Sequence, residues 1–254
     1  MPAFRSLPAA GRVFTTRRQV RSTDVTPVGR LRFDALARYL QQVAEDDLAD
    51  AAWDEPYGWR VRKISVAVRE FPQFGTQVWL HTFCSATGPR WAERTTTVTG
   101  PGGDLLQATA VWAAVGRTDG RPATLGPDFH RLFGAAAQGR SVSIRLSHPR
   151  PPAKPEGGFW PLRASDFDPA GHVNNAIHWA AVEDVLAGLD WLPDGAELEY
   201  HRPVLPGCDP YLAASHQQDE VSMWLMDGPQ RLASARLARG DWNGSSRAGR
   251  ASQD

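Results

Sequence analysis

The feature that most constrains the fold of this chain is an order of predicted elements that occurs twice. In each half a β-rich segment is followed by a turn, an amphipathic helix and a series of β-rich segments. The two turns, residues 24–29 and 166–171, carry Asp, Pro and Gly at matching positions with a constant offset. We therefore interpret the chain as a diverged internal duplication.

Periodicity predicts the elements of both halves. Apolar residues at helical spacing predict a helix over residues 33–51 and a second from the later turn to residue 189. Alternating and β-branched residues between Gly and Pro breakers predict the strands. Strands are expected at 13–22, 63–71, 76–87, 90–99, 105–116, 160–164, 197–202, 211–217, 221–226 and 232–238. The pattern predicts an α+β fold in which each repeat pairs one helix with an antiparallel meander.

A local peak of proline suggests where the repeats are joined. Residues 146–158 are expected to run as an extended, Pro-rich linker between two domains. The N-terminal domain would then cover residues 1–145 and the C-terminal domain residues 159–239. Residues 240–254 are rich in Gly, Ser and charge, which predicts a flexible tail.

Charge and cysteine usage exclude several classes of function. Basic and acidic residues balance, with 28 of each and a pI near 7.1, and the basic residues are scattered, which argues against nucleic acid as a partner. No apolar run approaches the roughly 20 residues that span a bilayer, so no membrane residence is expected. Cys84 and Cys208 are too few for a disulfide framework and lack metal-binding spacing. A reduced, cytoplasmic protein without metal or organic cofactor is expected.

The second turn carries the polar groups from which a reaction site can be built. Residues 166–175 combine carboxylates, a histidine and two amides around a Pro and a Gly, directly before a helix. Where this segment has Asp168 and His172, the first repeat has Thr26 and Arg30. The single active site is therefore expected in the second half, where helix-start N–H groups could stabilise a negatively charged oxygen.

Each polar residue of the second turn has a chemical and a structural interpretation. Asp168 could take a proton from water, or it could simply cap the helix. His172 could orient Asp168 or the water, or hydrogen-bond the substrate carbonyl, or it could satisfy a loop carbonyl. The N–H groups from Gly171 to Val173 are candidate substrate-binding donors, since glycine allows a close backbone approach.

Amides and further carboxylates complete the candidate set. Asn174 is predicted to contact the carbonyl or water, whereas Asn175 is expected to tie down the loop. Glu199 is a second candidate for activating water, with an unknown side-chain direction on its strand. Glu183 and Asp184 could be a replacement acid pair, although an exposed helix face is the usual place for such carboxylates.

The ordered set of segments resembles the double hot-dog acyl-[acyl-carrier-protein] thioesterases. The likeness covers most of the chain and rests on residues 40–44, 71–75, 90–91, 108–112, 165–175 and 198–202. It implies two tandem hot-dog repeats, each a long helix wrapped by a curved antiparallel sheet. The first repeat would accommodate the acyl chain and the second would carry the chemistry, with Asp168 and His172 matching members of the family's catalytic set.

Two departures from the family pattern bear on how water is activated. Ala170 stands where the family has an Asn, and Pro203-Val204 stands where it has a Glu-Cys pair. The resemblance implies a hydrolase that releases free fatty acid from acyl-acyl carrier protein, or from coenzyme A thioesters, by carboxylate-assisted attack of water. A monomer or a homodimer is compatible with it.

The same departures keep two other functions open. A degenerate hot dog could bind acyl thioesters or a carrier protein without cleaving them. A hot-dog hydratase acting on enoyl thioesters is a third interpretation, but Pro-Ala-Gly separates Asp168 from His172, where an Asn-Pro would be expected.

Overall fold

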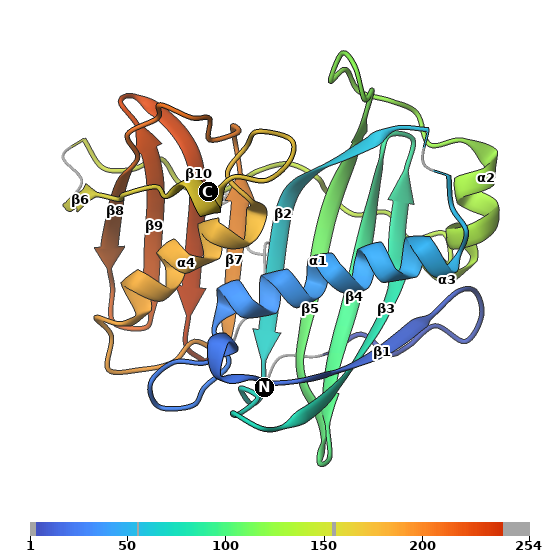
Figure 1. Ribbon diagram of the computed structural model, residues 1–254, viewed down its shortest axis with the longest axis horizontal. Coiled ribbons are helices and arrows are strands. Elements are labelled where there is room, and N and C mark those ends of the chain that lie inside the picture. The colour runs from blue at the N-terminus through green and yellow to red at the C-terminus, as the bar shows by residue number, and fades with distance from the viewer. Residues whose placement is uncertain (1–3, 55, 154–155, 241–254) are drawn as a thin grey trace, which may run out of the picture.

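The two halves of the chain share one antiparallel sheet, and both long helices lie on the same face of it (Figure 1). The structure is a computed structural model that describes residues 4–54, 56–153 and 156–240. The ten-stranded sheet has the order β1-β3-β4-β5-β2-β7-β10-β9-β8-β6. The first-half strands are β1 Phe14–Gln19, β2 Gly58–Val68, β3 Gln77–Gly88, β4 Trp91–Gly100 and β5 Gly103–Val115. The second-half strands are β6 Gly157–Phe159, β7 Gly195–Tyr200, β8 Tyr211–His216, β9 Glu220–Asp227 and β10 Gln230–Ala238.

The strand order confirms the duplication. Outward from the junction, the first half reads β2, β5, β4, β3, β1, and the second half reads β7, β10, β9, β8, β6. Each strand therefore has a counterpart at the same distance from the centre. The halves meet where β2 pairs with β7 antiparallel, from Lys63 opposite Glu199 to Ala67 opposite Gly195. The expected α+β double hot dog is the observed fold.

The two turns before the long helices have the same backbone hydrogen bonds. In the first, Thr26 N donates to Arg30 O and Gly29 N donates to Thr26 O; in the second, Asp168 N donates to His172 O and Gly171 N donates to Asp168 O. Gly29 and Gly171 have φ angles of 87° and 76°, which favour glycine. The duplicated turn is therefore conserved in shape between the repeats.

Each turn is preceded by a short 3-10 helix with its own acidic cap. These helices are Ser22–Asp24 and Ala164–Asp166. The carboxylate of Asp166 accepts a hydrogen bond from Arg163 N at 2.8 Å, and Asp24 accepts one from Arg21 N at 2.9 Å. Asp166 is thus a cap residue of this short helix.

The long helices, α1 (Phe33–Asp50) and α4 (Asn175–Leu186), pack against each other and against the sheet. One apolar core runs through both repeats. Phe33 of α1 and Trp179 of α4 stack with ring centroids 5.4 Å apart, and both are almost fully buried. The repeats thus share a core as well as a sheet, so neither buries its apolar helix face alone.

A helical segment between the repeats was missing from the expected elements. It consists of α2 (Pro127–Phe129), a π-helical stretch (His130–Gly134) and α3 (Ala135–Ala137). Phe129, Phe133 and Ala137 recur at helical spacing, and Pro127 takes the first helical position, where proline is favoured. These signals were present in the sequence. The segment belongs to a second apolar cluster beside the C-terminal end of α1.

Some predicted boundaries differ from the structure. The strand expected at residues 160–164 is instead β6, Gly157–Phe159, which pairs with β8. Trp160 N still donates to Pro210 O, but Pro161 has no N–H to extend the ladder. The second long helix ends at Leu186 rather than at residue 189. Of the predicted tail, residues 241–254 lie outside the described residues. No described helix is both long and apolar enough to cross a bilayer.

Candidate active site

A cavity of about 310 Å³ lies between α1 and the sheet of the first repeat, and residues of the second repeat complete its wall. Asp168 and Asn175 come from the turn and start of α4, whereas the remaining lining residues belong to the first half. The first-half lining residues are Gln41, Ala44, Glu45, Leu48, Trp59, Cys84, Ala92, Glu93, Arg94, Trp112, Phe129 and Phe133. The cavity thus combines a polar part with an aromatic part.

Asp168 is held rigidly at the wall of this cavity. Its Oδ1 atom accepts a hydrogen bond from Ala170 N at 2.9 Å and a longer one from His172 N at 3.4 Å. Among the described residues, no protein donor contacts Oδ2. The turn therefore presents a carboxylate with one oxygen fixed and the other able to accept a hydrogen bond from water or substrate.

The backbone N–H groups expected to bind a substrate oxygen are already used within the protein. Gly171 N donates to Asp168 O, His172 N to the Asp168 carboxylate, and Val173 N to Val204 O at 2.9 Å. The prediction that Gly171 and Val173 offer free donors is therefore corrected: the turn itself accepts from Gly171 N, and the Val204 carbonyl accepts from Val173 N. The His172 ring is half-buried and makes no hydrogen bond within the described part of the chain.

The two asparagines occupy different positions from those expected. Asn174 is the N-cap of α4: its Oδ1 accepts from Ala176 N at 2.9 Å, and its carbonyl accepts from Nδ1 of His178. Asn175 is the one that lines the cavity. Its carbonyl accepts a hydrogen bond from the Tyr200 hydroxyl at 3.1 Å. The structure therefore places Asn174 in the helix cap and Asn175 beside Asp168.

Glu199 lies on the other face of the sheet. Its strand neighbours Leu198 and Tyr200 belong to the core under the helices, so Glu199 points away from the cavity. It is fully buried there, and its carboxylate accepts from Ser147 N at 2.6 Å and from His148 N at 3.2 Å. The structure does not bring Glu199 together with Asp168, and the carboxylate instead anchors the linker.

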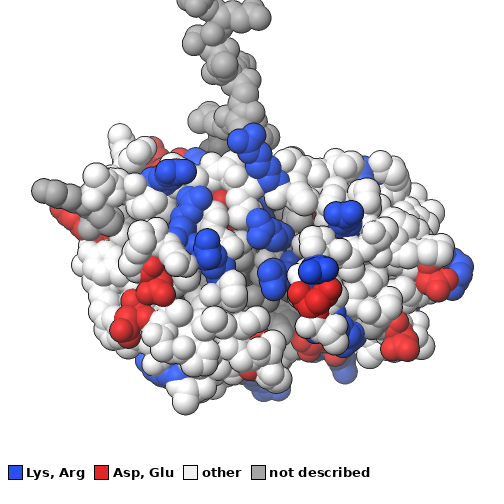
Figure 2. Space-filling model, turned by 90° about the horizontal axis from the view of Figure 1, so that it is seen from above, with Lys and Arg blue, Asp and Glu red and all other residues white. Residues whose placement is uncertain are grey.

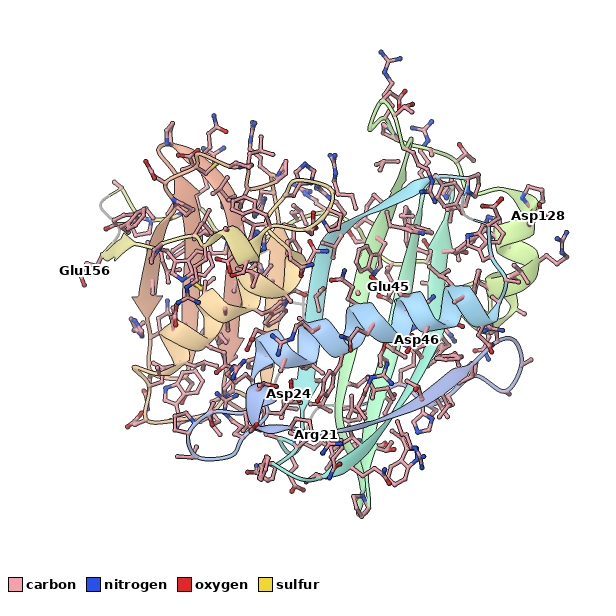
Figure 3. All side chains as sticks on the ribbon, in the orientation of Figure 1. Arg21, Asp24, Glu45, Asp46, Asp128 and Glu156 are labelled. Atoms are coloured by element: carbon pink, nitrogen blue, oxygen red, sulfur yellow. The ribbon has the colours of Figure 1, made fainter. Side chains whose placement is uncertain are left out.

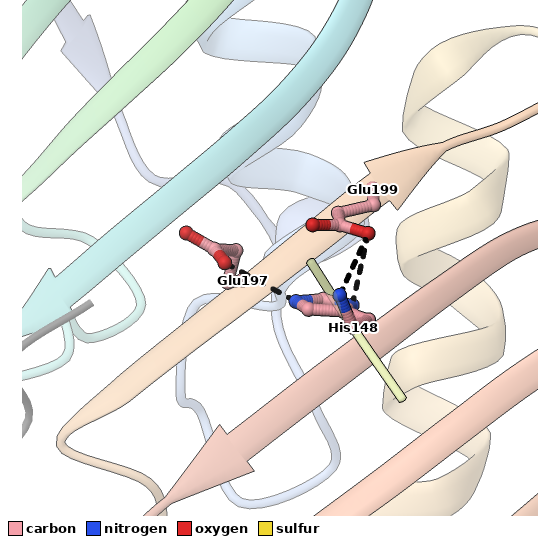
Figure 4. Close-up of side chains that lie close together, drawn as sticks. All are labelled: His148, Glu197 and Glu199. Carbon is pink, nitrogen blue, oxygen red and sulfur yellow. Dashed lines mark hydrogen bonds and ion pairs between the residues drawn. The ribbon is translucent and has the colours of Figure 1, made fainter. Parts of the chain in front are cut away.

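Glu199 belongs to a buried polar cluster with His148 and Glu197 (Figure 4). The His148 ring lies between the two carboxylates, with Nε2 3.2 Å from Glu197 and Nδ1 3.1 Å from the Ser234 hydroxyl. Burial alone would raise the pKa of Glu197, but hydrogen bonds from His148 and Ser65 and the charge of Lys63 hold it below its usual value. The cluster attaches the linker to the centre of the sheet.

The residue types of this cluster are those that bind divalent metal ions. The ligand atoms of His148, Glu197 and Glu199 lie within 4.8 Å of one another. However, both His148 nitrogens face protein partners, and the Lys63 ammonium is 3.7 Å from Glu197. Hydrogen bonds and charge compensation within the protein therefore account for this cluster without a metal ion.

Positive charge gathers over the middle of the upper face of the molecule (Figure 2). Burial and the nearby cations Arg231 and Arg62 lower the pKa of His201 to about 4, so its ring is neutral near pH 7. Arg231 also donates to the linker carbonyls of His148 and Pro149. His201 begins the segment whose Val204 pairs with the site loop. Arg62 and Arg231 therefore bring positive charge close to the start of that segment.

Sequence reasoning missed the cavity residues that come from the first repeat. Gln41 and Glu45 lie on α1, and Arg94 lies on β4, where it is paired with Asp47 of α1 at 2.6 Å. The signal that could have found them is the helical spacing of Gln41 and Glu45 on a helix that must cover the sheet. Cys84 also lines the cavity, but burial raises the pKa of its thiol to about 12, so it is no thiolate nucleophile.

A helix wrapped by a curved antiparallel sheet, present twice in one chain with a cavity between helix and sheet, defines a double hot-dog protein. Residues 11–133 match the family model described as the acyl-ACP thioesterase N-terminal domain. The first half of the chain is therefore similar to the acyl-ACP thioesterase family.

Relatives and solved structures agree over most of the chain. The Mycobacterium tuberculosis (strain ATCC 25618 / H37Rv) protein named "Uncharacterized protein Rv2001" is 29% identical over 235 residues, covering 91% of this chain and 94% of that protein. The 12:0-ACP thioesterase from Umbellularia californica superposes with a TM-score of 0.75 at 19% identity, covering 89% of this chain and 96% of that one. An acyl-ACP thioesterase from Bacteroides thetaiotaomicron VPI-5482 gives 0.74 at 16% identity, covering 89% and 97%. These structural matches show the shared fold.

Proposed function

We propose that this protein hydrolyses acyl thioesters and releases a free fatty acid, with acyl-acyl carrier protein as the substrate and acyl-coenzyme A as the other thioester source. The match of residues 11–133 to the acyl-ACP thioesterase model supports thioester hydrolysis as the class of reaction. The observation that carries the proposal is the position of Asp168 in the wall of a cavity that four aromatic side chains also line. Such a cavity can bury an acyl chain while a carboxylate meets the carbonyl end.

In the proposed reaction, the acyl chain packs against aromatic residues such as Trp59, Phe129 and Phe133. The carbonyl carbon lies beside Asp168, whose Oδ2 accepts a proton from water while the water oxygen bonds to that carbon. The carbon–sulfur bond then breaks, and the proton passes from Asp168 to the leaving thiolate. The products are a carboxylic acid and a thiol.

The other residues of the second turn have supporting roles in this proposal. His172 orients Asp168 through its backbone and offers its free imidazole to the carbonyl oxygen or to water. Asn174 caps α4 and so fixes the start of that helix. Asn175 lines the cavity together with Asp168. Glu199 lies outside the cavity and holds the linker against β7, the strand that ends at Tyr200. The positive charge of Arg62 and Arg231 near His201 suits the phosphate that both carrier protein and coenzyme A substrates bear.

The test is a hydrolysis panel with the purified full-length chain. Acyl carrier protein and coenzyme A thioesters of several chain lengths are supplied, and the released thiol is measured against a protein-free control. Asp168→Ala and His172→Ala are expected to lower turnover strongly while the circular dichroism spectrum stays unchanged. Asp190→Asn, which removes an exposed carboxylate outside the cavity-lining set, is the matched control and should behave like the wild type. Wild-type turnover from the Asp168 or His172 variant would sink the assignment.

A second function is favoured by the two departures from the family pattern. Ala170 is exposed on the turn, and Val204 is fully buried, with its carbonyl accepting a hydrogen bond from Val173 N, so neither position supplies an acid or an amide side chain. A protein that binds acyl thioesters or an acyl carrier protein without cleaving them would have these properties. Tight binding of a thioester with no thiol release above the buffer rate would support this function over hydrolysis.

A further inference from the structure

The acidic end of α1 contains four carboxylates, and three of them are paired with arginine. Arg18 contacts Asp46 at 2.6 Å, and Arg12 bridges Asp47 and Asp50. Glu45 is the exception, because within the described residues it has no cationic partner. Its one hydrogen bond comes from the side-chain amide of Gln41, which donates to Oε1 at 3.2 Å.

Glu45 is also the member of this group that lines the cavity. It shares that wall with Gln41 one turn earlier on α1 and with Asp168 and Asn175 from the second repeat. Figure 3 shows Glu45 and Asp46 on opposite sides of the helix. An unpaired carboxylate, supported by a neighbouring amide, thus faces the same space as the Asp168 carboxylate.

We propose that Glu45, positioned by Gln41, is a second catalytic carboxylate that binds the attacking water together with Asp168. This inference rests on the proposed hydrolysis. A water molecule that donates one hydrogen to Oδ2 of Asp168 and the other to Oε2 of Glu45 turns its lone pairs toward a carbonyl carbon in the cavity. Attack then transfers the first proton to Asp168. The hydrogen bond to Glu45 keeps the water oxygen oriented, and the negative charge of Glu45 favours the proton transfer.

This arrangement would also account for the departures at Ala170 and Pro203. Those positions lie in the second repeat, whereas Glu45 approaches the cavity from the helix of the first repeat. The acidic group that the second repeat lacks would thus be supplied across the repeat interface. The site would be assembled from both halves of the chain, with one carboxylate from each.

The experiment compares Glu45→Gln with Asp46→Asn in the full-length protein. Both carboxylates belong to the same turn of α1, but Asp46 does not line the cavity, so its variant controls for charge and helix stability. Glu45 is exposed and makes a single weak contact, so its variant should fold normally. The expected result is a kcat at least ten-fold lower for Glu45→Gln with KM changed by less than about three-fold, and wild-type kinetics for Asp46→Asn.

A pH profile distinguishes a catalytic from a structural role. If both carboxylates must be ionised, the acid limb of log(kcat/KM) against pH should have a slope of about two in the wild type and about one in Glu45→Gln. A Glu45→Gln enzyme within two-fold of the wild type, or one that retains the wild-type slope, overturns the inference. If Asp168→Ala is inactive in that case, the proposed function survives without Glu45, whereas a wild type that releases no thiol overturns both proposals.

Discussion

The ion pair between Arg30 and Glu183 permits a quantitative prediction of stability. Arg30 is the first-repeat counterpart of His172, and its guanidinium contacts the Glu183 carboxylate of α4 through two hydrogen bonds, at 2.5 and 3.1 Å. The same carboxylate accepts from Phe33 N, at the start of α1, at 2.6 Å. The two side chains are 8% and 11% exposed, so the pair is close to fully desolvated.

Glu183→Gln keeps the shape of the side chain and an oxygen for Phe33 N, but it leaves the Arg30 charge buried without a counterion. Breaking one partner of a buried pair costs about 3–5 kcal/mol. Because the amide still accepts from Phe33 N, we expect the lower end, about 3 kcal/mol. For a chain of this size that loss lowers Tm by about 6–12 °C. Turnover of the folded protein should change little, since the pair lies in the turn that lacks the reactive groups.

The assay is urea unfolding at pH 7, followed by circular dichroism, in a double-mutant cycle. The cycle uses Glu183→Gln, Arg30→Met and the double variant, which should recover at least about 2 kcal/mol relative to the sum of the single variants. Asp184→Asn is the matched control: this exposed neighbour accepts one hydrogen bond from Trp160, which an Asn oxygen can also accept. A loss below about 1 kcal/mol for Glu183→Gln, or additive single effects, would refute the reasoning.

Three further predictions concern groups around α4 and the linker. Asn174→Ala should lower the free energy of unfolding by about 1 kcal/mol through loss of the helix cap, measured by urea unfolding, and Asn174→Asp should retain most of it. Glu199→Gln should destabilise by about 1–3 kcal/mol, because a charged acceptor of two linker N–H groups is lost, while kcat of the folded protein stays within two-fold; a selective loss of kcat would contradict its placement behind the sheet. Burial lowers the pKa of His178 from 6.5 to about 4, so the unfolded chain binds the extra proton first as pH falls. The contribution of the neutral, buried His178 to the free energy of unfolding is therefore full above pH 6.5 and is lost progressively down to about pH 4. It amounts to roughly 3 kcal/mol, and a pH series of unfolding curves in which His178→Asn is as acid-sensitive as the wild type would contradict it.

The sequence was sufficient for the architecture because the duplicated turn has a strict backbone requirement. A glycine with positive φ, preceded by a proline that sets the turn, occurs at the same place in both repeats. Such a turn tolerates few other residues, so the two copies stayed recognisable while the side chains around them diverged. Helix and strand spacing then placed the two long helices and the strands to within a few residues, whereas the helical segment at residues 127–137 was missed.

The site could be predicted only in part, because side-chain direction depends on neighbours that are distant in the sequence. The assignment of Asn174 and Asn175 depended on which of them starts the helix, and a shift by one residue exchanges the cap for the cavity wall. For Glu199 the strand alternation already contained the answer: apolar Leu198 and Tyr200 must face the core, so the residue between them faces the other way. Glu45 could not be assigned to the cavity that Asp168 also lines, because that cavity arises from packing of the two repeats.

The asymmetry between the repeats follows from the way they are paired. Each turn faces the helix of the other repeat: the second turn brings Asp168 to the cavity wall that α1 forms, and the first brings Arg30 to Glu183 of α4. The two turn–helix contacts are equivalent by duplication. The contact of the second turn with α1 borders a cavity, whereas the contact of the first turn with α4 is occupied by the buried Arg30–Glu183 ion pair. A single repeat could supply either the turn or the opposing helix, but not both. In a duplicated chain the two copies can diverge independently, so one interface can bind a substrate while the other stabilises the fold.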